Sequence, residues 1–511
     1  MMRKLLSVGG FTLLSRITGF ARDALLAWTL GAGLLSDAFM VAFLFPNYFR
    51  AIFGEGTINP AFLPRYAALH ARGEKAAAAK FANAVFAWQM AAQIVLLVLA
   101  TAFMPAIIHV LAPGWSGEQF ALTVSLARVT FPYLIMTLVA VQLSAMLNAI
   151  DRFWAGAFWS NLQNLAMIGA LLLWRHFPNA GYAAAWGVFA GGVAQLLFIV
   201  WAGARDGLWL KPAWPRWTPE IREFFIAFGA VTFGAASIVI APFIDTMLAS
   251  LLPTGSRTAL YYADRINQLP LGVLGIALGT VLLPEMSARL ARGDAAGSSA
   301  AQNRSAAMSL LLTLPFMATF LLIPGTIIRA VFLHGAFNPE AATLASWALM
   351  AYGAGLPAMA MLRIVQATFY ARHDTLTPAR GTVIALVGNI VLKILFVWGM
   401  DLGVAGLALG TALGAWINIA ILTATGRSRA LLAIEAQFVK SLAPALLAAL
   451  ACGAGAWAGA RLGDDALPGR YRDVAALAAA MALAGLAYGG TVLAFRRHLP
   501  LRLAPGARNA E

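Results

Sequence analysis

Long apolar runs separated by short polar loops fill this chain from end to end. Each run is continuous rather than alternating and about 20 residues long, the length a helix needs to cross a hydrocarbon core about 30 Å thick. No polar stretch is long enough for a separate soluble domain, so the pattern predicts an all-α polytopic membrane protein. The fourteen predicted spans are 5–30, 34–54, 81–105, 121–148, 156–175, 182–204, 223–251, 257–284, 305–327, 342–370, 379–400, 403–426, 438–460 and 472–495.

The composition agrees with this interpretation. Of 511 residues, 61% are hydrophobic and 11% are charged, against about 25% charged residues in an average soluble domain. A formal net charge of +15 would suit a nucleic-acid partner, but most Lys and Arg lie in loops on alternate sides of the predicted spans. This distribution follows the positive-inside rule, argues against nucleic acid and predicts that both termini are cytoplasmic.

An internal repeat divides the chain. Shifting it by about 220 residues places AFLPRYAALHARGE, ending at Glu74, on VLLPEMSARLARGD, ending at Asp294, and Gly114 on Gly335. A duplicated unit of six spans enters the membrane twice in the same orientation, so an axis along the membrane normal should relate the copies. The expected parts are an N-lobe over 1–220, a C-lobe over 221–440, and two additional helices with a basic tail over 441–511.

Charged and polar side chains interrupt the first, second and eighth spans. An ionised group at mid-membrane costs roughly 2.5 to 3.5 kcal/mol, so it persists only beside water, an opposite charge or a ligand. Arg16 and Asp23 lie two turns apart on nearly one face of the first span. Arg22 points elsewhere, with Ser15 and Thr18. The other interrupting groups are Asp37, Asn47, Arg50, Glu55, Tyr261, Asp264, Arg265 and Gln268.

Two explanations fit these charges. One is a set of intramembrane ion pairs, in which the arginines of the first two spans pair with nearby carboxylates and Arg265 pairs with Asp264. The other is a solvated, net cationic cavity between the lobes. The number of charges favours the cavity, because apolar packing would stabilise a purely structural bundle equally well. A guanidinium stays charged and binds phosphate oxygens bidentately, so we expect an anionic, phosphate-bearing substrate.

A second polar group is predicted in the C-lobe. Asp245 lies in the seventh span, Asn389 and Lys393 are four residues apart in the eleventh, and Thr411 lies in the twelfth. Carboxylate, amide and hydroxyl oxygens would suit a small cation. The ammonium of Lys393 favours a salt bridge with Asp245 instead.

Other patterns indicate structure rather than chemistry. The lone cysteine and the scattered histidines give no metal-ligand spacing, so no metal site or cofactor is expected. An enzyme is disfavoured because no GxSxG, HExxH or Walker A pattern occurs. Close helix packing is predicted at Gly187, Gly191, Gly406, Gly410, Gly414, Gly453, Gly455 and Gly459. A membrane-interface anchor is predicted at Trp209, Lys211, Trp214, Arg216 and Trp217.

Three segments resemble the signature segments of the bacterial lipid II flippases, the MviN/MurJ type. They are SRITGFARD, DAFMVAFLFPNYFRAIFGEGTINPAFLP and YYADRINQLPLGVLGIALGTVLLP. The resemblance covers essentially the whole chain. It implies the multidrug/oligosaccharidyl-lipid/polysaccharide exporter fold, with two six-helix lobes, an inner cavity and a lipid-facing groove along the last two helices.

The resemblance also implies a function. The expected activity is export of the undecaprenyl-pyrophosphate-linked peptidoglycan precursor, lipid II, across the bacterial cytoplasmic (inner) membrane, for peptidoglycan biosynthesis and cell shape. Membrane lipids and cell-wall synthesis proteins are the expected further partners. The residues that match the family's cavity charges are Arg16, Arg22, Asp37, Arg50 and Arg265, accompanied by Asn47, Glu55 and Asp264.

One departure from the family bears on energy coupling. Some members hold sodium beside an acidic residue similar to Asp245, but here Lys393 stands where an oxygen ligand is expected. Coupling to a monovalent cation or to the membrane potential therefore stays open.

Three rival functions remain. A drug or O-antigen exporter would share the lobes, although an exporter of cations should have an acidic cavity. A non-transporting membrane scaffold would bind a lipid-linked intermediate without alternating access. An intramembrane glycosyltransferase would change the lipid covalently.

Overall fold

The computed structural model describes residues 2–50, 52, 57–466 and 471–499. Helices account for nearly all of these residues, and no strand occurs among them. The predicted all-α class is therefore confirmed. By Cα packing the chain divides into two compact units, Met1–Thr258 with His334–Asn338 and Ala259–Leu333 with Pro339–Glu511.

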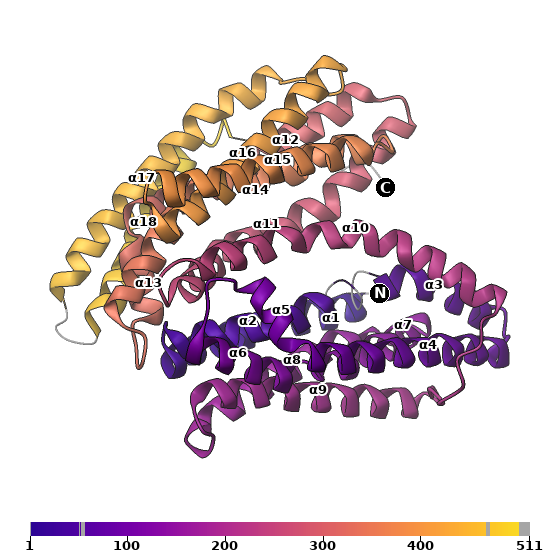
Figure 1. Ribbon diagram of the computed structural model, residues 1–511. Helices are drawn as coiled ribbons and strands as arrows, with labels where there is room; N and C mark the ends of the chain where they lie inside the picture. Colours follow the sequence, from indigo (N-terminus) through magenta and orange to yellow (C-terminus); the bar gives the residue numbers. More distant parts are fainter. Residues whose placement is uncertain (1, 51, 53–56, 467–470, 500–511) are drawn as a thin grey trace. The chain divides into compact units, whose positions relative to one another are not determined.

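Unit 1 contains the first ten helices and one short 3-10 turn (Figure 1). Their bounds are α1 Met2–Leu30, α2 Leu34–Phe49, α3 Asn59–Ala71, α4 Lys75–Ala102, α5 Met104–Leu111, α6 Gly117–Thr130, α7 Tyr133–Ala149, α8 Phe153–Leu172, η2 Trp174–His176, α9 Ala180–Arg205 and α10 Pro219–Ser250. The helix α10 opens the predicted C-lobe, yet it packs on α3, α4 and α5 within unit 1.

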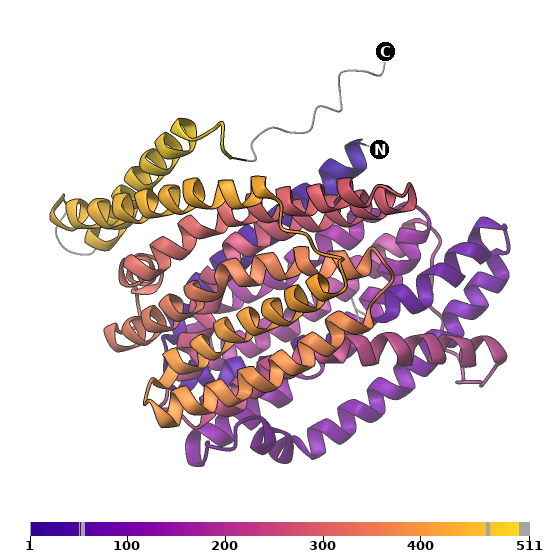
Figure 2. The ribbon, with the colours of Figure 1, turned by 90° about the horizontal axis from the view of Figure 1, so that it is seen from above.

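Unit 2 contains the remaining helices. Their bounds are α11 Ser256–Ala291, whose first turn belongs to unit 1, α12 Ala295–Leu322, α13 Pro324–Phe332, α14 Pro339–Tyr370, α15 Leu376–Ile394, the π-helical turn η3 Leu395–Gly399, α16 Gly403–Ser428, α17 Ala436–Ala466 and α18 Arg472–Ala494. The last two helices form an antiparallel hairpin, seen as the neighbouring yellow helices in Figures 1 and 2.

Nine helices in the described part of the chain are long and apolar enough to cross a membrane. Five further predicted spans, 5–30, 34–54, 156–175, 223–251 and 257–284, do not belong to these nine, although their described residues are mainly helical. The chain is thus a multi-pass membrane protein, while the count of fourteen spans stays a prediction.

One predicted span is interrupted, and three short helices were not predicted. The predicted span 121–148 lies within one candidate membrane span, Gly117–Ala149, which a break at Phe131–Pro132 divides into α6 and α7. Proline lacks the N–H that a continuous helix would use there. Hydropathy also gave no sign of α3, α5 and α13, because helices of 13, 8 and 9 residues are too short to span a membrane.

Glycines set the closest helix contacts, as the sequence predicts. A Cβ on Gly187 or Gly191 of α9 would lie 2.9 Å from the Cα atom of Met167 or Gln163 in α8. In the terminal hairpin, a Cβ on Gly459 would lie 2.4 Å from the carbonyl oxygen of Ala479. Such approaches exclude any side chain at these positions.

Two ion pairs in loops lie at corresponding positions of the two sequence repeats, about 220 residues apart. In unit 1, Arg152 after α7 pairs with Asp206 after α9 at 3.1 Å. In unit 2, Asp374 after α14 pairs with Arg429 after α16 at 3.2 Å, so the signs of the two charges are exchanged. Hydrogen bonds from the Thr377 side chain and backbone lower the pKa of Asp374, and the charge of Arg429 adds to this effect.

The terminal hairpin provides a test of glycine packing. Gly459→Leu should lower the stability of the purified protein by about 1–3 kcal/mol, because backbone atoms of α18 cannot make room for the side chain. Gly485→Leu in α18 is the matched control, since a Cβ there meets nothing within 4 Å. The apparent melting temperature checks this, and equal effects of both substitutions would contradict it.

Candidate functional site

The first helix carries a buried polar contact to α8. Arg22, 9% exposed, donates from Nε and Nη2 to one oxygen of Asp23 at 2.9 and 2.7 Å. Its Nη1 donates to Asn164 Oδ1 of α8 at 2.9 Å. The Asn164 amide in turn donates to the Ser15 carbonyl at 3.2 Å and to Thr18 Oγ1 at 3.1 Å. Arg22 therefore lies on the side of Ser15 and Thr18, as predicted, and the ion-pair explanation holds for it.

Arg16 has a different environment. Its side chain is exposed, and no hydrogen bond or ion pair ties it to any other residue in the part of the chain that the structure describes. Neither Asp23 nor Asp37 is its partner, so the ion-pair alternative does not hold for Arg16 with these two carboxylates. A guanidinium in this state is available to bind an anion.

The carboxylate of Asp37 is 1% exposed and joins α2 to the start of α11. Its two oxygens accept hydrogen bonds from Gly255 N at 2.7 Å, Thr258 N at 2.9 Å and Thr258 Oγ1 at 2.6 Å. The first-turn N–H groups of a helix lack intrahelical partners, and the helix dipole favours an anion there. Asp37 therefore caps α11, while its role as a substrate contact stays a prediction.

Close backbone contacts accompany this capping carboxylate. A Cβ on Gly335 would lie 2.4 Å from the Trp28 carbonyl oxygen near the end of α1, and Ala336 N donates to the same oxygen at 2.9 Å. A Cβ on Gly114, which the repeat aligns with Gly335, would lie 2.2 Å from the Ser250 carbonyl oxygen at the end of α10. The loop of Gly335, in the predicted C-lobe, thus packs on α1, the first helix of the predicted N-lobe. The aligned loop of Gly114, in the predicted N-lobe, packs on α10, the first helix of the predicted C-lobe.

The end of α2 carries the next predicted residues. Asn47 and Arg50 share a face as expected, since Arg50 Nη2 donates to Asn47 Oδ1 at 3.2 Å. Both side chains are half-buried. The predicted residue Glu55 lies outside the described residues.

The predicted residues of the eighth span lie in α11 and belong to unit 2. Arg265 Nη2 donates to the hydroxyl of Tyr261 at 2.9 Å, and its guanidinium lies 4.9 Å from the centre of that ring. Gln268 donates to Asp264. The shared face of Tyr261 and Arg265 is therefore confirmed, and the aromatic ring holds the cation in place.

The second predicted group is only partly assembled within unit 2. Asn389 and Lys393 of α15 are buried at 8% and 1% exposure, and both pack on α16, against Gly414 and Gly410 respectively. The Thr411 hydroxyl donates to the carbonyl of Leu407 in its own helix. Asp245 belongs to unit 1, where it is half-buried in α10. Its salt bridge with Lys393, or a cation site, stays a prediction.

Sequence reasoning missed the partners that stabilise two of these charges. Asn164 and Asn161, in the NLQN segment of α8, are 7% and 0% exposed. Three polar residues close together in an apolar span could have indicated that this helix contacts a charged group. Gly255 has a φ of +94°, but nothing in its neighbourhood indicated a carboxylate from α2.

Solved structures share this fold. A structure titled lipid II flippase MurJ, inward closed conformation, superposes with a TM-score of 0.79 and 23% identity, covering 96% of this chain and 99% of its own. An inward-facing multidrug resistance MATE transporter of the MOP superfamily gives a TM-score of 0.68 and 15% identity, with 83% and 98% covered. The chain therefore has the fold of MOP superfamily transporters.

Sequence comparisons narrow this class. The model of the family described as lipid II flippase MurJ matches residues 26–465. A probable lipid II flippase MurJ of Rhizobium tropici is 38% identical over 89% of this chain and 86% of its own length. A counterpart from Vibrio cholerae is 32% identical over 81% of each chain. The chain belongs to the lipid II flippase MurJ family.

The different environments of Arg22 and Arg16 predict different effects on stability. Arg22→Gln removes the cation that pairs with the buried Asp23 carboxylate and should destabilise the protein by about 3 kcal/mol or more. Arg16→Gln removes an exposed, unpaired cation and should change stability by less than about 0.5 kcal/mol. Thermal unfolding in detergent measures both. An equal loss for Arg16→Gln would assign Arg16 a structural role.

The capping carboxylate gives a second prediction. Asp37→Asn replaces one acceptor by an NH2 group that faces N–H donors, so stability should fall by about 1.5–3 kcal/mol. Asp294→Asn is the matched control, because exposed Asp294 caps α12 through Gly297 N and Asn caps a helix equally well. The same thermal measurement compares the two variants. Indistinguishable melting temperatures for Asp37→Asn and wild type would contradict the capping role.

Proposed function

We propose that this chain exports lipid II from the cytoplasmic to the periplasmic leaflet of the bacterial inner membrane by alternating access. Membership of the family supports the substrate. The observation that carries the mechanism is Arg16, an exposed guanidinium in a helix of the bundle with no protein partner among the described residues. In a helix that is predicted to span the membrane, an uncompensated cation is expected only where water or an anionic ligand meets it.

Intramembrane arginines are proposed to bind the headgroup of the substrate. Arg16 and Arg50 in unit 1, and Arg265 in unit 2, each offer N–H donors that match the oxygens of a pyrophosphate. The Tyr261 ring and hydroxyl orient the Arg265 guanidinium, and Asn47 orients that of Arg50. Preorganised donors lose less conformational freedom when the headgroup binds.

The prenyl tail is proposed to stay in lipid along the terminal hairpin. Large apolar side chains of α17 and α18 are solvent-accessible in unit 2, among them Leu450, Leu462, Met481 and Leu486, each at least 65% exposed. Such faces suit contact with acyl or prenyl chains. This arrangement keeps the apolar tail out of a polar cavity during transport.

Headgroup charge can bias the direction of transport. An inside-negative potential favours outward movement of an anion by about 2.3 kcal/mol per elementary charge per 100 mV. We propose that the two predicted lobes, 1–220 and 221–440, rock about their shared axis and that this potential contributes to the cycle. The hydrogen bonds between Asp37 and the start of α11 would break if α2 and α11 separated, so Asp37 is proposed to stabilise one end state of the cycle.

Reconstitution with labelled lipid II tests this function. Arg16→Gln and Arg265→Gln should each reduce the translocation rate by about tenfold or more, since charge-assisted hydrogen bonds to a phosphate contribute roughly 1.5–3 kcal/mol. Arg292→Gln in the exposed loop after α11 is the matched control and should transport normally. Label accessibility from each side, with and without an imposed potential, gives the rates.

The outcomes separate the rival functions. Binding without translocation by the wild-type protein would indicate a scaffold, and a change in lipid mass would indicate a transferase. Normal translocation by Arg16→Gln and Arg265→Gln would overturn the proposed role of the arginines.

A further inference from the structure

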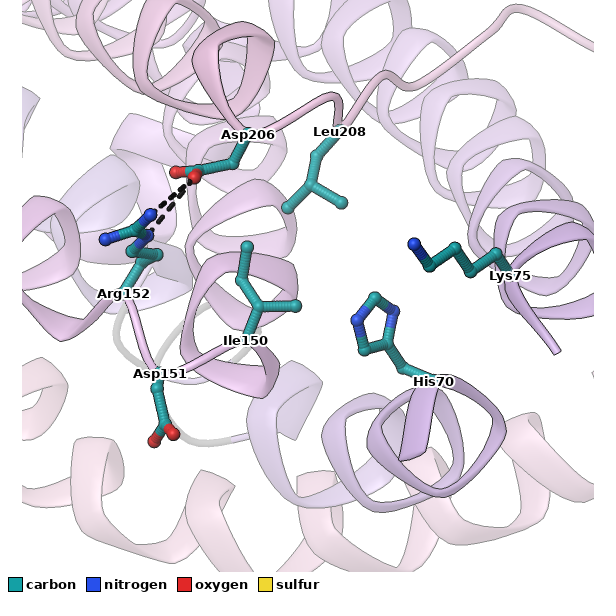
Figure 3. Close-up of a pocket in the computed structure, with 7 residues that line it drawn as sticks. All are labelled: His70, Lys75, Ile150, Asp151, Arg152, Asp206 and Leu208. Atoms are coloured by element: carbon teal, nitrogen blue, oxygen red, sulfur yellow. Dashed lines mark hydrogen bonds and ion pairs between the residues drawn. The ribbon is translucent and has the colours of Figure 1, made fainter. Parts of the chain in front are cut away.

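A pocket of about 390 Å³ lies in unit 1, away from the predicted site residues (Figure 3). It forms where α3 ends, where α4 begins, and in the loops that follow α7 and α9. The charge distribution predicts that this end of the unit is cytoplasmic. The lining residues are His70, Lys75, Ile150, Asp151, Arg152, Asp206 and Leu208.

Among the charged side chains that line this pocket, the ammonium group of Lys75 is the one that borders its open space. Arg152 donates from Nε and Nη2 to Asp206 Oδ1, each at 3.1 Å, so these two charges neutralise each other. The Asp151 carboxylate points away from the open space in Figure 3. Lys75 forms no ion pair with any carboxylate that the structure describes. The pocket therefore offers an ammonium group beside the imidazole of His70.

The remaining walls of the pocket are apolar. Ile150 and Leu208 border the same open space as His70 and Lys75 (Figure 3). An ammonium and an imidazole N–H can donate to phosphate oxygens, while the two aliphatic side chains suit the carbon atoms of an ester. The chemistry points to a phosphate group attached to an apolar molecule.

The segment that follows the pocket indicates where such a molecule comes from. Residues 207–218 link α9 to α10 and are held along α4, because Lys211 N donates to Asn83 Oδ1 at 2.8 Å and Trp88 Nε1 donates to the Arg216 carbonyl at 3.1 Å. The most apolar stretch of α4 is only 22% buried inside the protein, as expected of a helix that faces lipid.

The same segment carries the side chains of a membrane interface. Trp209, Trp214 and Trp217 are 55%, 85% and 60% exposed. Tryptophan is enriched at the headgroup level of membranes, and basic residues there attract anionic lipids. Lys211 and Arg216 supply those cations, and both are exposed.

We propose that this pocket binds the phosphate of an anionic phospholipid headgroup. Lys75 is the cation, His70 is the second donor, and the tryptophan-bearing segment 207–218 lies in the headgroup layer beside it. A lipid bound here would fix the ends of α3, α7 and α9 relative to one another. The site is independent of the proposed transport of lipid II and uses none of the intramembrane arginines.

Native mass spectrometry of the delipidated full-length protein in neutral detergent tests the proposal. Phosphatidylglycerol should bind more tightly than phosphatidylcholine, and Lys75→Gln should weaken phosphatidylglycerol binding by about tenfold. Lys80→Gln is the matched control, because it removes the same charge from an exposed position of the same helix outside the pocket. His70→Gln should produce a smaller loss, and Lys80→Gln should stay within about twofold of wild type.

Several outcomes would overturn this site. Equal affinity for the two lipids, or equal losses in Lys75→Gln and Lys80→Gln, would mean diffuse attraction to the surface. Competition by inorganic phosphate at concentrations comparable to those of the lipid would identify a soluble anion as the ligand. If Lys75→Gln does not fold, Leu208→Glu places a carboxylate at the pocket instead, and undiminished phosphatidylglycerol binding by that variant would equally refute the proposal.

Discussion

A charge inside a membrane protein must be compensated, and this constraint decides how the described helices pack. Arg22 is compensated locally, by the neighbouring Asp23 and by an amide of α8. Asp37 is compensated by residues far away in the sequence, through the N–H groups of Gly255, just before α11, and of Thr258 in its first turn. Each contact fixes one helix against another, because removing either partner would leave a buried polar group unsatisfied.

The same constraint separates structural charges from functional ones. Arg22 and Asp37 have their hydrogen bonds within the protein, so both ion pairing and helix capping explain them without a substrate. Arg16 has no such explanation in the described chain. Arg265 is oriented by Tyr261, and whether it contacts a substrate stays a prediction. The ion-pair explanation therefore holds for Arg22, while the cavity explanation stays a prediction for Arg16.

The features that the sequence predicted best are contacts between residues three or four positions apart in the same helix. The all-α class, the shared side of Arg22 and Thr18, and the contact of Asn47 with Arg50 follow from a spacing of three or four residues. The glycine contacts of α17 with α18 followed from small-residue spacing in the same way. These features are local, so helical periodicity is sufficient to find them.

The sequence could not predict contacts made by the tertiary fold. Asp37 meets Gly255 and Thr258 more than 200 positions away, and no pattern near α2 signals that pairing. Short helices such as α5 escape a hydropathy search tuned to the thickness of a bilayer. The placement of α10 in unit 1 likewise depends on packing rather than on its position in the sequence repeat.

The central claim is that intramembrane guanidinium groups persist because they bind an anionic lipid headgroup. The most direct measurement is the equilibrium affinity of the detergent-purified protein for lipid II and for undecaprenol, which lacks the pyrophosphate. The account predicts that wild type prefers lipid II by about tenfold or more and that the double variant Arg16→Gln, Arg265→Gln loses this preference. An unchanged preference in a folded double variant would contradict it.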